Sequence, residues 1–224
     1  MEQGITSLPL EEKSRKVAQG VFINCPFDAG YQPFFEALVF TIISCGFEPR
    51  CSLENVSSNK NRFEKIIELI YECDIAIHDL SALGISDSGV PRFNMPFELG
   101  LFEGATRFAK DLNHKSYLIF EGEKYSFHKA LSDLAGVDPV AHNGDVIILI
   151  TAVRKFLMST MPSNSLISLP YPNEIRINHS KFVDQVSTLT SDKYNWAAIR
   201  GNFTEMRAFM KVWISKINAL SSNS

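Results

Sequence analysis

The chain has 224 residues, of which 45% are hydrophobic and 21% charged, as in an ordinary folded protein with one domain and room for a small appendage. Its 17 Phe, 6 Tyr and 2 Trp residues can fill a large core, which excludes extensive disorder. The 22 basic and 25 acidic side chains give a formal charge of −3, without the basic excess typical of proteins that bind nucleic-acid phosphates. We therefore expect no direct nucleic-acid partner.

Neither membrane insertion nor secretion is predicted. The most apolar stretch, residues 37–45, is much shorter than the about 20 residues that a spanning helix needs. The charged N-terminus does not resemble a signal peptide. The four cysteines lack C-x-x-C spacing, which favours reduced thiols in a cytoplasmic protein. A zinc site would require Cys73 and His78 to find distant partners, so we expect no metal and no bound cofactor.

Strand and helix patterns alternate after a polar arm at 1–19. They predict a strand at 20–24, a helix at 31–45, a strand at 47–53, a helix at 59–71, a strand at 74–80, a helix at 96–110, a strand at 116–120, a short helix at 126–134, an edge strand at 137–140 and a helix at 145–158. In the helix at 59–71, Phe63, Ile66, Ile67 and Ile70 are expected to face inward. The alternation predicts an α/β fold: a flavodoxin-like open parallel sheet of about five strands with helices on both faces.

A linker at 162–173, which contains three prolines, separates this α/β domain (20–161) from a C-terminal helical segment (174–224). The segment carries Trp196, Phe203, Phe209 and Trp213, too many large aromatic side chains to leave in water. They are expected to pack on the α/β domain as a pair of helices, or to form an interface with a second copy or an activating partner. The two alternatives are compatible, and a neighbouring copy could order the loop at 84–91.

In parallel α/β sheets, ligands bind beyond the carboxyl ends of the strands. The first strand ends in a turn that carries an amide, an aromatic ring and a carboxylate, with a tyrosine nearby: Asn24, Pro26, Phe27, Asp28 and Tyr31. These groups could stack a base and bind a ribose. The alternative is a proline-fixed turn in which Asp28 caps the next helix and Phe27 packs in the core. The chain has neither a G-x-G-x-x-G nor a P-loop lysine motif.

Asp79 ends the third strand and is expected to face the same crevice. The alternative is an Asx-turn leaving the strand. His78 alternates to the other face of the sheet, so we interpret it as a structural histidine.

A third group of candidate residues lies at the start of the next helix. Glu98 is predicted in its first turn among apolar neighbours, where it is a candidate catalytic carboxylate, or only a charge that favours the helix N-terminus. Gly100 and Gly104 destabilise a helix by about 1 kcal/mol each relative to Ala, which is understandable if a ligand or a strand approaches closely. Glu103 is expected to be solvated.

The strand that ends in Asp79, followed by a loop and a helix with Phe97-Glu98-Leu99-Gly100, resembles the nucleoside 2-deoxyribosyltransferase-like proteins and the related TIR domains that cleave NAD. The resemblance covers residues 20–160. It implies that Glu98 is the catalytic carboxylate and that Asp79 holds the sugar or the base. The turn at 24–28 and the segment at 92–94 depart from the usual sequences of both families, so the resemblance does not identify the substrate.

Cleavage of an N-glycosidic bond passes through an oxocarbenium-like state that a carboxylate stabilises or traps. Nicotinamide leaves from a cationic ring without a second acid, so one convincing carboxylate favours NAD or a related nucleotide as the substrate. Asn24 and Asp79 would then hold ribose hydroxyls, Phe27 and Tyr31 the base, and Arg92 the phosphates, with Asn94 beside it. Arg92 could equally be a surface cation.

The leading hypothesis is therefore an N-glycoside hydrolase. The resemblance also suggests an effector in bacterial antiphage defence that is activated by a partner protein or by homo-oligomeric assembly. The alternatives are a non-catalytic nucleotide-binding module and a nucleoside deoxyribosyltransferase.

Overall fold

A computed structural model describes residues 18–54, 61–83, 92–126, 131–134, 136–162, 169–188 and 196–221. The N-terminal arm at 1–17 and the loop at 84–91 lie outside the described residues, as do residues 127–130 of the predicted short helix at 126–134.

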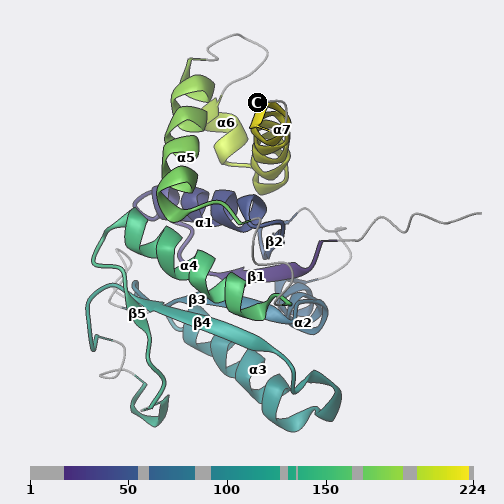
Figure 1. The fold of residues 1–224 in the computed structure, drawn as a ribbon. Helices are drawn as coiled ribbons and strands as arrows, with labels where there is room; N and C mark the ends of the chain where they lie inside the picture. Colours follow the sequence, from purple (N-terminus) through teal and green to yellow (C-terminus); the bar gives the residue numbers. More distant parts are fainter. Residues whose placement is uncertain are drawn as a thin grey trace, which may run out of the picture.

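The described strands form one parallel sheet (Figure 1). Its members are β1 (Gly20–Asn24), β2 (Glu48–Cys51), β3 (Ile75–Asp79), β4 (Ser116–Glu121) and β5 (Val140–Ala141). The order is β2-β1-β3-β4-β5, and all neighbours pair in parallel. The predicted flavodoxin-like α/β fold is confirmed.

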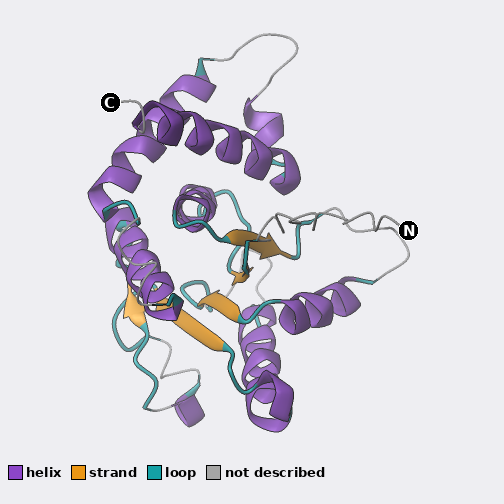
Figure 2. Ribbon diagram, turned by 45° about the vertical axis from the view of Figure 1, so that its right-hand side comes forward, coloured by secondary structure: helices purple, strands orange, loops and turns teal. Residues whose placement is uncertain are grey.

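Helices cover both faces of the sheet, as Figures 1 and 2 show. One face carries α1 (Gln32–Ser44) and α4 (Val146–Thr160), and the other carries α2 (Arg62–Glu72) and α3 (Asn94–Phe108). Gly46 ends α1 with a φ of 83°, a left-handed conformation that glycine adopts without steric penalty. Asn61 and Glu64 form a reciprocal capping box at the start of α2.

The C-terminal helices α5 (Pro172–Ser187), α6 (Trp196–Arg200) and α7 (Phe203–Ser221) form a further layer on α1 (Figure 1). The ring of Phe203 lies 5.8 Å from that of Phe35 on α1, and Phe182 lies 5.3 Å from Trp196. These side chains share one hydrophobic core with the α1 side of the sheet. The aromatic residues of this segment therefore pack within the same chain, the first of the two expected arrangements.

Several boundaries differ from the predictions. Helix α3 begins at Asn94 rather than at 96, and α5 begins at Pro172, inside the predicted linker. The predicted inward face of α2 is wrong in part, because Phe63 and Ile67 are 49% and 42% exposed. The buried residues of α2 are Ile66, Leu69 and Ile70. Among the described elements, α3 covers only one side of α2, so Phe63 and Ile67 remain exposed.

The four cysteines are buried and unpaired, as predicted. Among the described residues, no group of three or more His, Cys, Asp or Glu side chains could hold a metal ion. None of the described helices combines the length and apolar character of a membrane span.

Candidate active site

A pocket of about 300 Å³ lies at the carboxyl edge of the sheet. It borders the end of β1, next to β3, where the strand order reverses and ligands bind in folds of this topology. Its volume is at the lower end of the range for small-molecule sites. The lining residues come from the loop after β1 and from the starts of α2 and α3: Asn24, Cys25, Pro26, Phe27, Asp28, Arg62, Arg92, Asn94, Met95 and Glu98.

Glu98 is the carboxyl group buried in this pocket wall. Glu98 is only 5% exposed, and no described residue forms a hydrogen bond or ion pair with its carboxyl group. It lies in the second turn of α3, not the first as predicted, because the helix begins at Asn94. Burial raises the pKa of Glu98 to about 7, against the opposing effect of the Arg62 guanidinium. Near neutral pH, the carboxyl group is therefore divided between its two protonation states.

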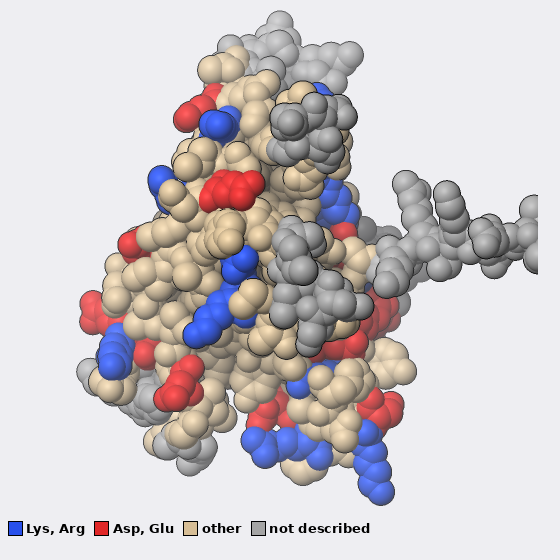
Figure 3. Space-filling model, in the orientation of Figure 1, with Lys and Arg blue, Asp and Glu red and all other residues tan. Residues whose placement is uncertain are grey.

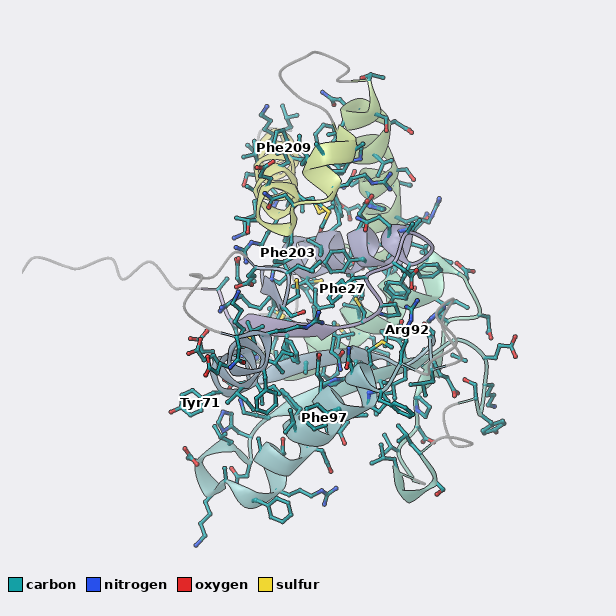
Figure 4. The ribbon with its side chains drawn as sticks, turned by 180° about the vertical axis from the view of Figure 1, so that it is seen from behind. Phe27, Tyr71, Arg92, Phe97, Phe203 and Phe209 are labelled. Carbon is teal, nitrogen blue, oxygen red and sulfur yellow. The ribbon has the colours of Figure 1, made fainter. Side chains whose placement is uncertain are left out.

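Two guanidinium groups face the same pocket. Arg62 is the exposed first residue of α2. Arg92 donates from Nη1 to Oδ2 of Asp28 across 2.5 Å, and Asp28 Oδ1 accepts the backbone N–H of Tyr31. The hydrogen bond from Arg92 lowers the pKa of Asp28 despite some burial. Asp28 therefore orients Arg92 beside the loop that carries Phe27 (Figure 4).

Asn24 lines the pocket but also has a structural role. Its side-chain amide donates to Nδ1 of His78 and to the carbonyl of Met95, each at 2.9 Å, which joins β1, β3 and α3. His78 is fully buried, and burial lowers its pKa to about 3, so the imidazole is neutral. Because Nδ1 accepts, the ring proton of His78 lies on Nε2. The interpretation of His78 as a structural histidine agrees with this geometry.

Asp79 and Tyr31, predicted to hold the ribose and the base, do not line the pocket. Both are buried, and the Tyr31 hydroxyl donates to Asp79 Oδ2 across 2.5 Å. The other oxygen of Asp79 accepts the backbone N–H of Ser81 at 2.8 Å. These contacts inside the protein occupy the groups that a substrate would need. All the other predicted site residues come together at the pocket.

The sequence interpretation missed Arg62, Cys25 and Met95 as lining residues. A signal for Arg62 was present: the Asn61-x-x-Glu64 pattern marks a helix start, and helices that follow parallel strands begin at the carboxyl edge of the sheet. Cys25 carries a thiol whose pKa is raised well above the usual value by burial and by the nearby Asp79. It is therefore a neutral wall group rather than a thiolate nucleophile.

No described strand lies against the two glycines of α3, so of the two expected reasons for them the neighbouring strand is not found. A Cβ at Gly100 would find no described atom within 4 Å beyond the helix backbone, and one at Gly104 would meet only the Phe108 ring, at 3.9 Å. Glu103 is not fully solvated either, because its side chain is 16% exposed and pairs with Arg107.

Comparisons of the chain with protein-family models, with curated proteins and with solved structures returned no match. What the pocket can do is therefore inferred from its own groups. They are a buried carboxyl group, two guanidinium groups, an exposed amide and a half-buried phenyl ring.

Proposed function

We propose that this protein is an N-glycoside hydrolase that cleaves the ribosyl–base bond of NAD or a related nucleotide, with Glu98 as the catalytic carboxylate. One observation carries the proposal: a carboxyl group without a described hydrogen-bond partner is buried in the wall of a pocket that also presents two guanidinium groups. Burying a carboxylate without hydrogen bonds is unfavourable for folding, so such a group is a candidate for chemistry.

In the proposed reaction, the C1′–N bond breaks and its electron pair leaves with the base. Ionised Glu98 stabilises or traps the resulting oxocarbenium-like centre, and water then adds its hydroxyl to C1′ and releases a proton. From NAD, the products are nicotinamide and an ADP-ribose. Because the pyridinium ring is already cationic, it needs no proton to depart.

The remaining pocket groups suit the rest of such a substrate. Arg62 and Arg92 would bind phosphate oxygens, a contact that guanidinium geometry favours. The ring of Phe27 would stack on a base, and the exposed amide of Asn94 would bind hydroxyl groups. Asp79 and Tyr31 would support the loop that carries Phe27, rather than touch the substrate.

The protonation of Glu98 favours a cationic substrate. A pyridinium ring beside the carboxyl group would lower its pKa from about 7 and so produce the ionised form on binding. A pKa of about 7 for Glu98 also suits deoxyribosyl transfer, the second candidate reaction. In that reaction, protonated Glu98 could donate a proton to a neutral leaving base.

Incubation of the purified chain with NAD, with nicotinamide release followed by chromatography, tests the proposal. We expect release by the wild type and a loss of at least about 100-fold in Glu98→Gln, the scale of removing a catalytic acid or base. Glu103→Gln is the matched control, because Glu103 lies on the same helix outside the pocket and should retain activity.

Other outcomes identify the alternatives. Calorimetric binding of NAD without turnover would indicate a nucleotide-binding module, and base exchange from a deoxynucleoside would indicate a transferase. The absence of all three activities in folded protein, alone and in assembled form, would reject the proposed site.

The proposed setting is bacterial antiphage defence, with activation by a partner or by assembly. Phage challenge of bacteria that express the wild type or Glu98→Gln tests this setting. We expect NAD depletion and protection only with the wild type, and equal protection by both variants would contradict the proposal.

A further inference from the structure

Helix α3 presents a row of exposed aromatic side chains. Phe93, at its N-cap, and Phe97 and Phe108 are each more than half exposed. Their spacing places them in one stripe along the helix, with Gly100 and Gly104 between them. Burial within the described structure does not explain why so much aromatic surface lies on one side of α3.

Helix α2 extends this surface. Phe63, Ile67 and Tyr71 follow one another at four-residue spacing and are exposed, and the Phe63 ring lies 6.0 Å from that of Phe97. Figure 4 shows Tyr71 and Phe97 on these neighbouring helices. The α2–α3 apolar face is defined here by six residues: Phe63, Ile67, Tyr71, Phe93, Phe97 and Phe108.

The exposed area of this face matches what a dimer needs. A large apolar side chain offers roughly 150–250 Å², so at the observed exposures the face presents on the order of 600 Å². This is at the upper end of the largest apolar patches on monomers, which often mark interaction sites. It would supply most of the about 800 Å² that each partner buries in a standard interface.

The face is also complementary to itself. Phe97 and Phe108 form ridges on α3, and the turns at Gly100 and Gly104 between them are open, since an added Cβ would meet almost nothing. A second α3 crossing in the opposite direction could place its ridges over these turns. The rim carries both signs of charge, with Arg62 and Glu64 on α2 and the Glu103–Arg107 pair on α3, so a two-fold contact can set acid against base.

We propose that the α2–α3 apolar face is the interface of a two-fold symmetric dimer of this chain. In a two-fold dimer, both subunits use the same surface patch, so that patch must contain both the protruding side chains and the open space that receives them. On α3, Phe97 and Phe108 protrude, and the turns at Gly100 and Gly104 provide the space. The close approach of the second α3 explains the two glycines, each of which destabilises an isolated helix by about 1 kcal/mol relative to Ala. The interface does not depend on the proposed catalytic role of Glu98.

Sedimentation velocity over a range of micromolar concentrations tests the dimer, with Gly100→Leu as the main variant. In the monomer, the added side chain meets open space and improves helix propensity, so the variant should unfold at the same temperature or higher. In the dimer, it blocks the partner helix. We expect dimerisation to weaken by about tenfold or more without loss of monomer stability.

Phe97→Ser with Phe108→Ser is the second variant, and Val212→Ser is its matched control, because Val212 is exposed on α7, away from this face. The double variant should be monomeric, and the control should dimerise like the wild type. A monomeric wild type, or a dimer that persists in both Gly100→Leu and the double variant, would overturn the proposal. An association found only with a different macromolecule would overturn it too.

Discussion

The hydroxyl group of Tyr31 donates a hydrogen bond of 2.5 Å to Oδ2 of Asp79, and both residues are buried. This bond joins the loop after β1 to the end of β3. Nε2 of His142 lies 3.4 Å from the same carboxylate oxygen. Nδ1 of His142 accepts the backbone N–H of Gly144, so a ring proton on Nε2 faces Asp79. The cluster is joined to the pocket through the backbone N–H of Tyr31, which donates to the lining residue Asp28.

The first prediction concerns this cluster. Tyr31→Phe removes a donor from a buried carboxylate and should lower the free energy of unfolding by about 2 kcal/mol at neutral pH. Tyr171→Phe is the control, because Tyr171 is 74% exposed and its change should stay within about 0.5 kcal/mol. Urea denaturation of both variants measures the difference.

The pH dependence of that difference has a definite sign. Burial acts to raise the pKa of Asp79, but the side chains of His142, Ser81 and Tyr31 outweigh it and hold the pKa below its usual value. A depressed carboxyl pKa contributes stability that is present above the unfolded pKa and is lost as pH falls through the folded pKa. The effect of Tyr31→Phe should therefore shrink in strong acid, and an effect that is constant with pH would contradict this assignment.

The second prediction is that Glu98→Gln stabilises the protein in mild base. The folded pKa of Glu98, about 7, is raised above the value of 4.5 expected for an unfolded chain, so folding takes up a proton between these values. Wild-type stability should fall as pH rises through this window, and Gln removes that loss. At 1.36 kcal/mol per pKa unit, the variant should gain up to about 3 kcal/mol near pH 8 and little near pH 4.

Thermal or chemical unfolding across this pH range measures the gain. Glu103→Gln makes the same change on the same helix outside the pocket, and it is the matched control. Equal stability of wild type and Glu98→Gln at every pH would mean that Glu98 is not desolvated in solution.

The third prediction distinguishes the roles of Arg62 and Arg92 in the pocket. Arg62 lowers the pKa of Glu98 against the larger effect of burial, so Arg62→Ala should raise that pKa above about 7. If cleavage requires the ionised carboxylate, the activity profile of this variant moves to higher pH. Arg92→Ala should weaken substrate binding with little shift of the profile, because Arg92 pairs with Asp28. Similar profiles for the two variants would argue against this division of roles.

The fourth prediction concerns the attachment of the C-terminal helices. Arg200 on α6 donates from Nε to Oε1 of Glu36, a residue of α1 that is 1% exposed. Arg200→Ala leaves the Gln32 amide, at 3.0 Å, as the remaining described hydrogen-bond donor to Glu36. Breaking a buried pair costs about 3–5 kcal/mol, but the Arg200 side chain is 36% exposed, so about 2–3 kcal/mol is expected.

A double-mutant cycle with Glu36→Gln tests the pair. The combined variant should be more stable than the sum of the two single changes indicates, with a coupling energy of about 1 kcal/mol or more. A coupling energy of zero, from chemical denaturation, would show that the two residues act independently.

The sequence by itself was sufficient for the fold class and for most of the pocket. Alternating apolar patterns of two different periods determine which segments are strands and which are helices, and parallel topology brings every strand end to one edge. Phe27, Arg92 and Glu98 could therefore be assigned to one site although they are far apart along the chain. The terminal residues of each helix were less certain, because local patterns specify them weakly.

Only the tertiary structure decided which polar groups remain available to a ligand and which apolar side chains remain exposed. Asp79 ends a strand as predicted, but residues distant in sequence, Tyr31 and His142, enclose its carboxylate. Phe63 lies on the apolar stripe of α2 as predicted, yet α3 covers only part of that stripe. The periodicity of a segment states which side chains share a face. What covers that face depends on contacts between segments far apart in sequence, which no local pattern contains.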